Sequence, residues 1–91
     1  MKSQMFYAKR RGQRITAFMA RDGSRCALCD QPLDRRLKDP TDPQYVTFDH
    51  KLPASRGGTD EPSNLRLAHR ACNERRGNAS DVWMNPNPVL K

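Results

Sequence analysis

Two pairs of potential metal ligands stand far apart in the chain with the same internal spacing. Cys26 and Cys29 form the first pair and His69 and Cys72 the second, each with two residues between its members. Short turns of this kind aim two side chains at one tetrahedral centre, and zinc sites commonly combine two such halves. All three cysteines and one of the two histidines would be used. The pattern predicts a structural Zn²⁺, and the alternative is a buried free cysteine beside an incidental Cys-x₂-Cys pair.

Three other kinds of cysteine-containing site are excluded, because the sequence lacks the features that each of them needs. A thioredoxin-like redox motif needs a βαβ unit that this sequence does not contain, and a DNA-reading C₂H₂ finger has only about 12 residues between its halves. Here residues 30–68 separate them. A zinc deaminase needs His-x-Glu followed by Pro-Cys-x-x-Cys, and neither occurs. Zinc would therefore hold together the two ends of the segment 30–68, which we call the excursion. We expect the functional residues to lie within it.

A second set of candidate side chains lies inside and just after this excursion. Asp49 directly precedes His50, which is the only imidazole left once zinc has taken His69. A carboxylate suits a hard divalent cation, and Asn73, the residue after Cys72, offers an amide oxygen on a segment that zinc would fix in space. Asp49 and Asn73 could then share one Mg²⁺ or Mn²⁺.

Short elements must position these residues. Apolar residues at i, i+3 and i+4 predict a helix over residues 14–21, which Gly23 would end. Pro and Asp mark residues 34–44 as an exposed loop. Aromatic and β-branched residues predict a strand from residue 45 to about residue 50, and the segment 55–63 is a glycine-containing loop.

The second half of the excursion returns toward the zinc ligands. Residues 64–68 alternate in polarity and predict a strand antiparallel to the first. The pattern turns helical and charged over residues 69–76, and Gly77 would end that helix. Ser80 could then cap one further turn before two prolines exclude more helix.

Composition narrows the class of protein. Leu, Ile, Val and Phe make up about 15% of the 91 residues, below the roughly 20% under which a charged chain is usually disordered, so a metal is expected to add stability. The formal net charge of +7 favours a polyanionic partner, above all nucleic acid, and the alternative is a solvated basic surface that keeps the protein soluble. No apolar run could span a membrane, and the polar N-terminus carries no secretory signal. We therefore expect a cytoplasmic location, where thiols stay reduced.

Taken in order, these residues resemble the HNH endonuclease family of the His-Me finger (ββα-metal) superfamily. The resemblance rests on the Cys-x₂-Cys pair, on FDHKLP with SRGG at residues 48–53 and 55–58, and on NLRLAHRACNERRG at residues 64–77. It covers residues 22–77. It implies a small α+β fold, a ββα-metal motif stabilised by a Cys₃His zinc knuckle, with a short N-terminal helix. We accordingly divide the chain into a basic lead-in (1–13), an HNH nuclease domain (14–77) and a C-terminal tail (78–91).

The resemblance also implies roles for individual residues. His50 matches the general base, and Asn64 matches the residue that holds the loop and the His50 backbone by hydrogen bonds. Asn73 stands where the last His of the motif usually lies, which makes this an H-N-N variant. His69 stands where many zinc-containing members carry Cys. The competing assignment, His69 as the final catalytic His, would leave zinc with three protein ligands.

The implied activity is metal-dependent hydrolysis of DNA phosphodiester bonds, by nicking or double-strand cutting, with 5′-phosphate and 3′-hydroxyl products. Asp49, His50, Asn64 and Asn73 would form the catalytic set, with the divalent metal on Asp49 and Asn73. Candidate phosphate contacts are Lys51, Arg56, Arg70, Arg75 and Arg76. Strong sequence specificity would require a homodimer or a partner protein, and small members of this kind resemble those of phages and mobile elements. The alternative function is a non-catalytic, zinc-stabilised DNA-binding module.

Overall fold

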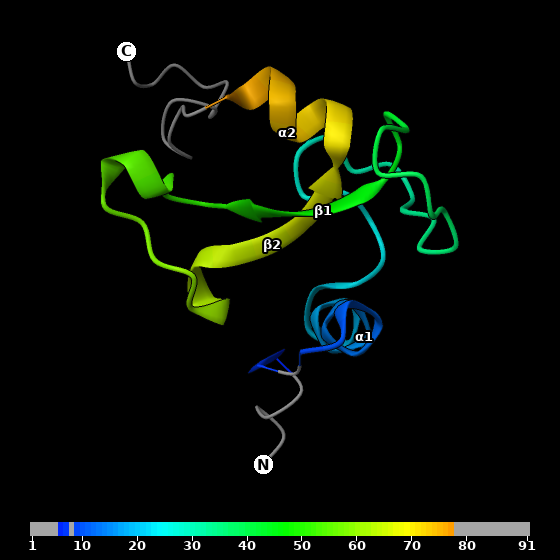
Figure 1. The fold of residues 1–91 in the computed structure, drawn as a ribbon, viewed down its shortest axis with the longest axis horizontal. Coiled ribbons are helices and arrows are strands. Elements are labelled where there is room, and N and C mark those ends of the chain that lie inside the picture. Colours follow the sequence, from blue (N-terminus) through cyan, green and yellow to red (C-terminus); the bar gives the residue numbers. More distant parts are fainter. Residues whose placement is uncertain (1–5, 8, 78–91) are drawn as a thin grey trace.

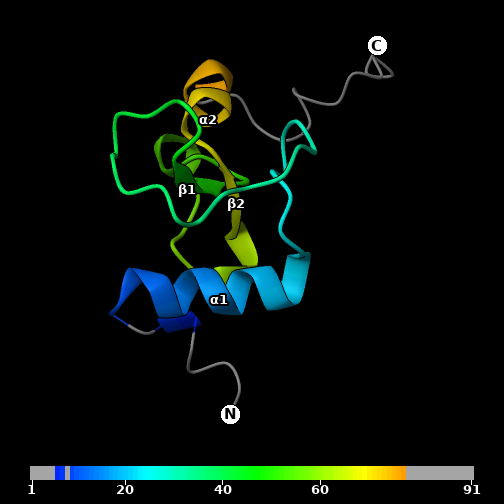
Figure 2. The ribbon, with the colours of Figure 1, turned by 90° about the vertical axis from the view of Figure 1, so that its right-hand side faces the viewer.

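Two helices enclose a two-stranded sheet. The structure, a computed structural model, describes residues 6, 7 and 9–77. Helix α1 (Arg11–Asp22) lies on one side of the sheet and helix α2 (Arg70–Arg76) on the other, with strands β1 (Val46–His50) and β2 (Leu65–His69) between them (Figures 1 and 2). The small α+β architecture expected from the sequence is confirmed.

Helix α1 presents an apolar face to the sheet. Ile15 and Phe18 are buried on that face, and the backbone N–H of Gly23 caps the end of the helix by donating to the Met19 carbonyl at 2.8 Å. The helix begins three residues before the predicted start. Its first turn is held by Arg11, whose guanidinium lies 4.3 Å from the Tyr45 ring centre and donates to the Val46 carbonyl. Periodicity carries no information about such a long-range contact.

The strands form an antiparallel pair in which Asp49 lies opposite Arg66 and Val46 lies opposite His69. Successive side chains of a strand point to opposite faces. Phe48 packs toward α1, with its ring centre 5.2 Å from that of Phe18. Asp49 contacts α2 instead. The two predicted strands are confirmed, and each begins one residue later than expected.

Helix α2 follows β2 without a connecting loop. His69 ends the strand and Arg70 begins the helix, which stops before Gly77 at a φ of 63°. A positive φ of this size favours glycine, so the predicted end of the helix is confirmed. The turn predicted at Ser80 lies outside the described residues.

The core lies between α1 and the sheet and extends to the first zinc half. Its buried members are Ile15, Phe18, Cys26, Leu33, Val46, Leu65, Leu67 and Ala68. Residues 34–44 leave this core as a mostly exposed loop that joins the first zinc half to β1 (Figure 1). Over the described residues, no helix has the length and apolar character that a membrane crossing needs.

Candidate active site and metal centre

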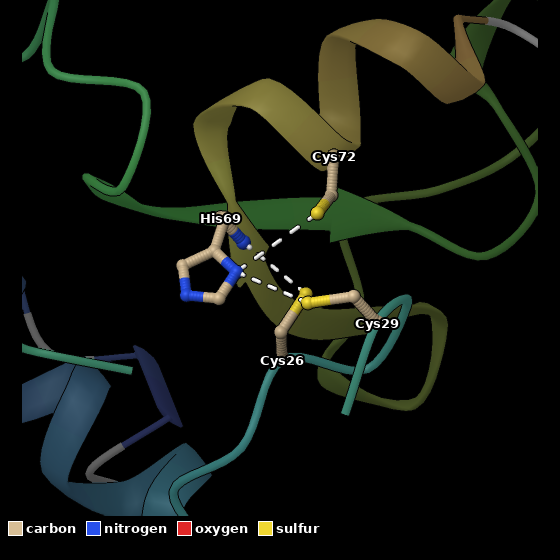
Figure 3. Close-up of side chains that lie close together, drawn as sticks. All are labelled: Cys26, Cys29, His69 and Cys72. Atoms are coloured by element: carbon tan, nitrogen blue, oxygen red, sulfur yellow. Dashed lines mark hydrogen bonds between the residues drawn. The ribbon is translucent and has the colours of Figure 1, made fainter. Parts of the chain in front are cut away.

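The four predicted zinc ligands converge on one point. Cys26, Cys29, His69 and Cys72 offer ligand atoms that all lie within 4.8 Å of one another (Figure 3). His69 Nδ1 lies 3.4 Å from Cys29 Sγ and 3.9 Å from Cys72 Sγ. A nitrogen and a sulfur on a tetrahedral zinc are separated by roughly 3.5 Å. The donor set and its spacing fit Zn²⁺.

The His69 ring is oriented for this role by a backbone carbonyl. Its Nε2 lies 2.9 Å from the Pro32 oxygen, so Nε2 carries the proton and donates it there. Nδ1 is then the free lone pair, and it faces the sulfurs. Carbonyl partners of this kind fix the tautomer of metal-binding histidines. His69, only 3% exposed, therefore lies in the metal cluster, and the alternative that it serves as a catalytic residue receives no support.

Backbone hydrogen bonds shape the first half of the cluster. The Cys26 N–H donates to the Gln31 carbonyl at 2.8 Å, and the Asp30 N–H donates to the Cys26 carbonyl at 2.9 Å. Asp30 takes a φ of 65°, which a short polar residue tolerates in such a tight turn. The Ala27 N–H then donates to Leu67 O at 2.9 Å and ties the turn to β2. The two ligand pairs are thus joined by backbone contacts as well as by their side chains.

The thiols differ in their readiness to ionise. Burial opposes ionisation of Cys26, but the backbone N–H groups of His69 and Leu28, each 3.4 Å from Sγ, help lower its pKa to about 7. Burial raises the pKa of Cys72 above its usual value. Zinc binds thiolates, so the cluster holds one thiol prepared for a metal and one that must still lose its proton.

His50 stands at the end of β1, where the chain enters the loop to β2. Its Nε2 lies 2.7 Å from Oδ1 of Asp60. The His50 side chain is 31% exposed, and that of Asp60 is 92% exposed. Asp60 is not among the site residues that the sequence predicts. Its position in an irregular loop, ten residues after His50, carries no periodic signal that could have found it.

Asn64 joins the two limbs of the loop between the strands. Its Oδ1 accepts from the Leu52 N–H at 2.9 Å, and its Nδ2 donates to the carbonyls of Leu52 and Thr59 at 3.1 and 2.7 Å. Its own carbonyl accepts from the Lys51 N–H at 2.8 Å. Asn64 thus holds the loop through its contacts with Lys51, Leu52 and Thr59, and its contacts at the end of β1 go to these neighbours of His50 and not to the His50 backbone itself.

The Asp49 carboxylate forms two buried ion pairs. Its Oδ2 accepts from Arg66 Nε at 2.8 Å, and its Oδ1 accepts from Arg76 Nη1 at 2.9 Å. The Asp49 side chain is 1% exposed. Two guanidinium charges on one carboxylate repel a further cation. As these side chains lie, both oxygens of the Asp49 carboxylate are paired with arginines, and a divalent metal ion would have to displace one of them.

Asn73 lies on the same side of the sheet as Asp49. Its Nδ2 is 3.2 Å from Thr47 Oγ1, and Thr47 precedes Asp49 by two residues on β1. Asn73 and Asp49 therefore share the layer between β1 and α2. His50 makes its side-chain contact in the loop instead, so Asp49 and His50 face different surroundings.

Comparison with known proteins identifies the family. A model of the HNH endonuclease family matches residues 26–79, more than half of the chain. The chain belongs to the HNH endonuclease family. No curated protein and no solved structure shows a significant match to it.

Membership of the HNH family indicates a nuclease-type function, with DNA binding and metal binding. The matched segment contains both zinc halves and every predicted catalytic residue. It excludes the whole of α1, which nevertheless supplies Ile15 and Phe18 to the core. The HNH segment is therefore completed by a helix that precedes it.

The basic residues of this HNH chain differ in their availability to DNA. Arg56 and Arg75 are exposed, and Lys51 and Arg70 are half-buried. Arg70 pairs with Glu74 at 2.8 Å. Arg76, also predicted as a phosphate contact, is buried with its side chain on Asp49 and on the Lys51 carbonyl. With these contacts, the Arg76 side chain is not available to bind a phosphate group of DNA.

Proposed function

We propose that the chain is a DNA endonuclease that hydrolyses phosphodiester bonds with His50 as the general base. The observation that carries the proposal is the HNH match together with the placement of the two histidines. One histidine is enclosed in the metal cluster, and the other is partly exposed at the end of β1. Only His50 is left to exchange a proton with solvent.

The hydrogen bond to Asp60 defines what His50 can do. Its Nε2 donates to a carboxylate, so Nδ1 of the neutral ring is the nitrogen that can accept a proton from water. Products with 5′-phosphate and 3′-hydroxyl ends follow from the family resemblance.

Asp49 and Asn73 stay the predicted ligands of a catalytic Mg²⁺ or Mn²⁺. Such an ion would stabilise charge on the phosphate and on the departing oxygen. The support is the shared layer between β1 and α2 in which both side chains lie. The ion pairs of Asp49 with Arg66 and Arg76 stand against it, so the cation requires a test of its own.

Zinc has a separate, structural role in the proposal. Cys26, Cys29, His69 and Cys72 would hold it and close the excursion of residues 30–68 at its base. Because these ligands need reduced thiols, we place the protein in the cytoplasm. A phage or mobile-element setting and a homodimer or partner protein for specificity are proposals from family analogy.

A non-catalytic DNA-binding module is the second candidate function. The observation that favours it is the Asp49 carboxylate, which is fully engaged by arginines. A binding module needs the basic surface alone and has no use for an oriented imidazole at His50.

Cleavage of supercoiled plasmid separates the two functions. Zinc-loaded wild type is compared with His50→Ala in Mg²⁺, in Mn²⁺ and in buffer without added divalent metal. Because a chelator would also strip the structural zinc, the zinc content is measured in every arm. His50→Ala should lose about 10²- to 10⁴-fold in cleavage rate, the usual contribution of a positioned general base.

The variant should keep its fold, its zinc and its DNA affinity, because the partly exposed His50 side chain is neither a ligand of the metal cluster nor a buried member of the core. The pH dependence of the cleavage rate should differ between the wild type and the variant, because only the wild type carries the base. A His50→Ala protein that releases zinc or unfolds would contradict the assignment. Wild type that binds but never cuts would favour the binding module.

A further inference from the structure

We propose that Asp60 is a positioning residue for His50, which holds the imidazole in one orientation with Nδ1 free to act as the base. The inference rests on the proposed function and adds a residue to it. It follows from the 2.7 Å contact between His50 Nε2 and Asp60 Oδ1 and from the way in which the surrounding loop is held.

The chemistry of the contact assigns the proton. A carboxylate only accepts hydrogen bonds, so Nε2 must be the donor. In a neutral imidazole the other nitrogen is then the acceptor. Asp60 therefore keeps the protonated nitrogen of His50 turned toward the loop and leaves the basic nitrogen for a reacting water.

An exposed ion pair alone is worth little, because both side chains are free to move. The backbone around Asp60 is not free to move in this way. Thr59, on one side of Asp60, gives its carbonyl to Asn64 Nδ2 at 2.7 Å. Glu61, on the other side, accepts from the Asn64 N–H at 2.8 Å and donates its own N–H to Thr59 Oγ1 at 3.3 Å. Asp60 is bracketed by residues that Asn64 holds.

The same loop folds back tightly on the segment that follows His50. The Gly58 N–H donates to the Pro53 carbonyl at 2.9 Å. A Cβ at position 58 would lie 1.7 Å from the Leu52 carbonyl oxygen, which no side chain could tolerate without a backbone shift. Gly58 thus permits the close approach of the two limbs. This approach and the contacts of Asn64 carry Asp60 to His50.

The test compares Asp60→Ala and Asp60→Glu with Glu61→Gln as the matched control. The control removes a neighbouring exposed carboxylate that contacts Tyr7 and not His50. Each zinc-loaded variant is examined by NMR for the exchange rate of the His50 Nε2 proton and for the order parameter of the His50 ring. His69, whose Nε2 donates to Pro32, serves as the reference imidazole within each sample.

Asp60→Ala should make the His50 Nε2 proton exchange faster and lower the ring order parameter, while the His69 signals stay unchanged. Single-turnover cleavage should fall about 10- to 100-fold, less than for a buried orienting carboxylate, with the DNA affinity retained. Asp60→Glu should recover part of both effects, and Glu61→Gln should match the wild type.

An Asp60→Ala protein whose His50 signals match those of Glu61→Gln would overturn the proposal, even if cleavage fell. Altered His50 signals with an unchanged cleavage rate would overturn it as well. If His50→Ala cleaves as fast as the wild type, the proposed function fails by itself, and the NMR arm still decides whether Asp60 holds the ring.

Discussion

Asp49 shows how much a residue's neighbours determine its chemistry. A carboxylate next to His50 is a good cation ligand by type, yet here it compensates two arginines inside the protein. Removing one partner of a buried ion pair costs about 3–5 kcal/mol, because it leaves an uncompensated charge. With Arg76 2% exposed at its side chain, Asp49 holds α2 and β2 to β1. A divalent cation at Asp49 has to compete with these guanidinium groups.

Replacing Arg66 should reveal that competition. Arg66→Gln removes one of the two positive charges on Asp49, and Mn²⁺ binding measured by electron paramagnetic resonance should tighten at least about 10-fold, since unit charges about 4 Å apart near a protein surface interact by about 4 kcal/mol. Arg75→Gln is the matched control, because it removes an exposed charge that does not contact Asp49. Equal Mn²⁺ affinity in the two variants would rule out Asp49 as a ligand in competition with Arg66.

Asn73 should tune the choice of metal. Asn73→His restores the commoner ligand of the family, so cleavage should persist with a shift toward softer divalent ions, which imidazole suits better than an amide oxygen does. Asn73→Ala should lose most of the cleavage. The measurement is plasmid cleavage titrated with Mg²⁺, Mn²⁺ and Co²⁺, and an Asn73→Ala enzyme that cuts like the wild type at limiting metal would contradict the ligand role.

At the scale of elements, the metal cluster lies at the junction at which strand β2 becomes helix α2. His69 ends β2 and Cys72 lies in the first turn of α2, so a metal bound there fixes the angle between them. Seven residues form too short a helix to be stable alone. The position of α2, and with it that of Asn73 and Arg76, depends on the metal cluster.

Removing zinc should therefore unfold the domain. Structural zinc contributes roughly 10 kcal/mol or more to small folds, and we expect one Zn²⁺ per chain by elemental analysis and loss of circular dichroism on chelation. His69→Ala should lose the metal, whereas His50→Ala, which removes the same type of side chain, should keep it. Burial raises the pKa of Cys72, so this thiol must release a proton on binding, and zinc affinity should weaken as the pH falls from about 8 to about 6. A folded, zinc-free His69→Ala protein would contradict this view.

The elements were predictable because their signals are local. The spacing of apolar residues predicts α1, and the run of aromatic and β-branched residues predicts β1. The paired spacing of Cys and His predicts the metal cluster. The contacts that decide the site are long-range. Arg76 meets Asp49 only because α2 packs on β1, and Asp60 meets His50 only through the folded loop. The pairing of Arg66 with Asp49 could have been predicted, because the antiparallel register places the two residues opposite each other.

At the scale of the whole molecule, the net charge of +7 overstates the charge available to DNA. Several arginines form contacts within the protein even where they are partly or largely exposed. Arg21 lies 4.7 Å from the Phe18 ring centre and donates to the carbonyls of Pro62 and Leu65, and Arg14 lies 4.6 Å from the Phe48 ring centre. These guanidinium groups join α1 to the sheet and its loop, so their loss should affect stability before it affects binding.

DNA affinity should show this division of labour in its salt dependence. Arg75→Ala should weaken binding and reduce the salt slope by about 1, the effect of one lost phosphate contact. Arg21→Ala should leave the slope unchanged and lower the melting temperature instead. Fluorescence anisotropy over a salt series, with thermal unfolding measured in parallel, checks both. A reduced slope in Arg21→Ala would place that side chain at the DNA.

The exposed loop of residues 34–44 has one more consequence, because it separates the two halves of the metal cluster. A chain cut after Lys38 would give one piece with α1, Cys26 and Cys29 and another with the sheet, α2, His69 and Cys72. Each piece carries half of the ligands and part of the core, and His50 lies on the second. Mixing the two pieces with zinc should restore the folded domain. The fold is therefore suited to metal-dependent fragment complementation, in which Zn²⁺ connects the two pieces in place of the peptide bond.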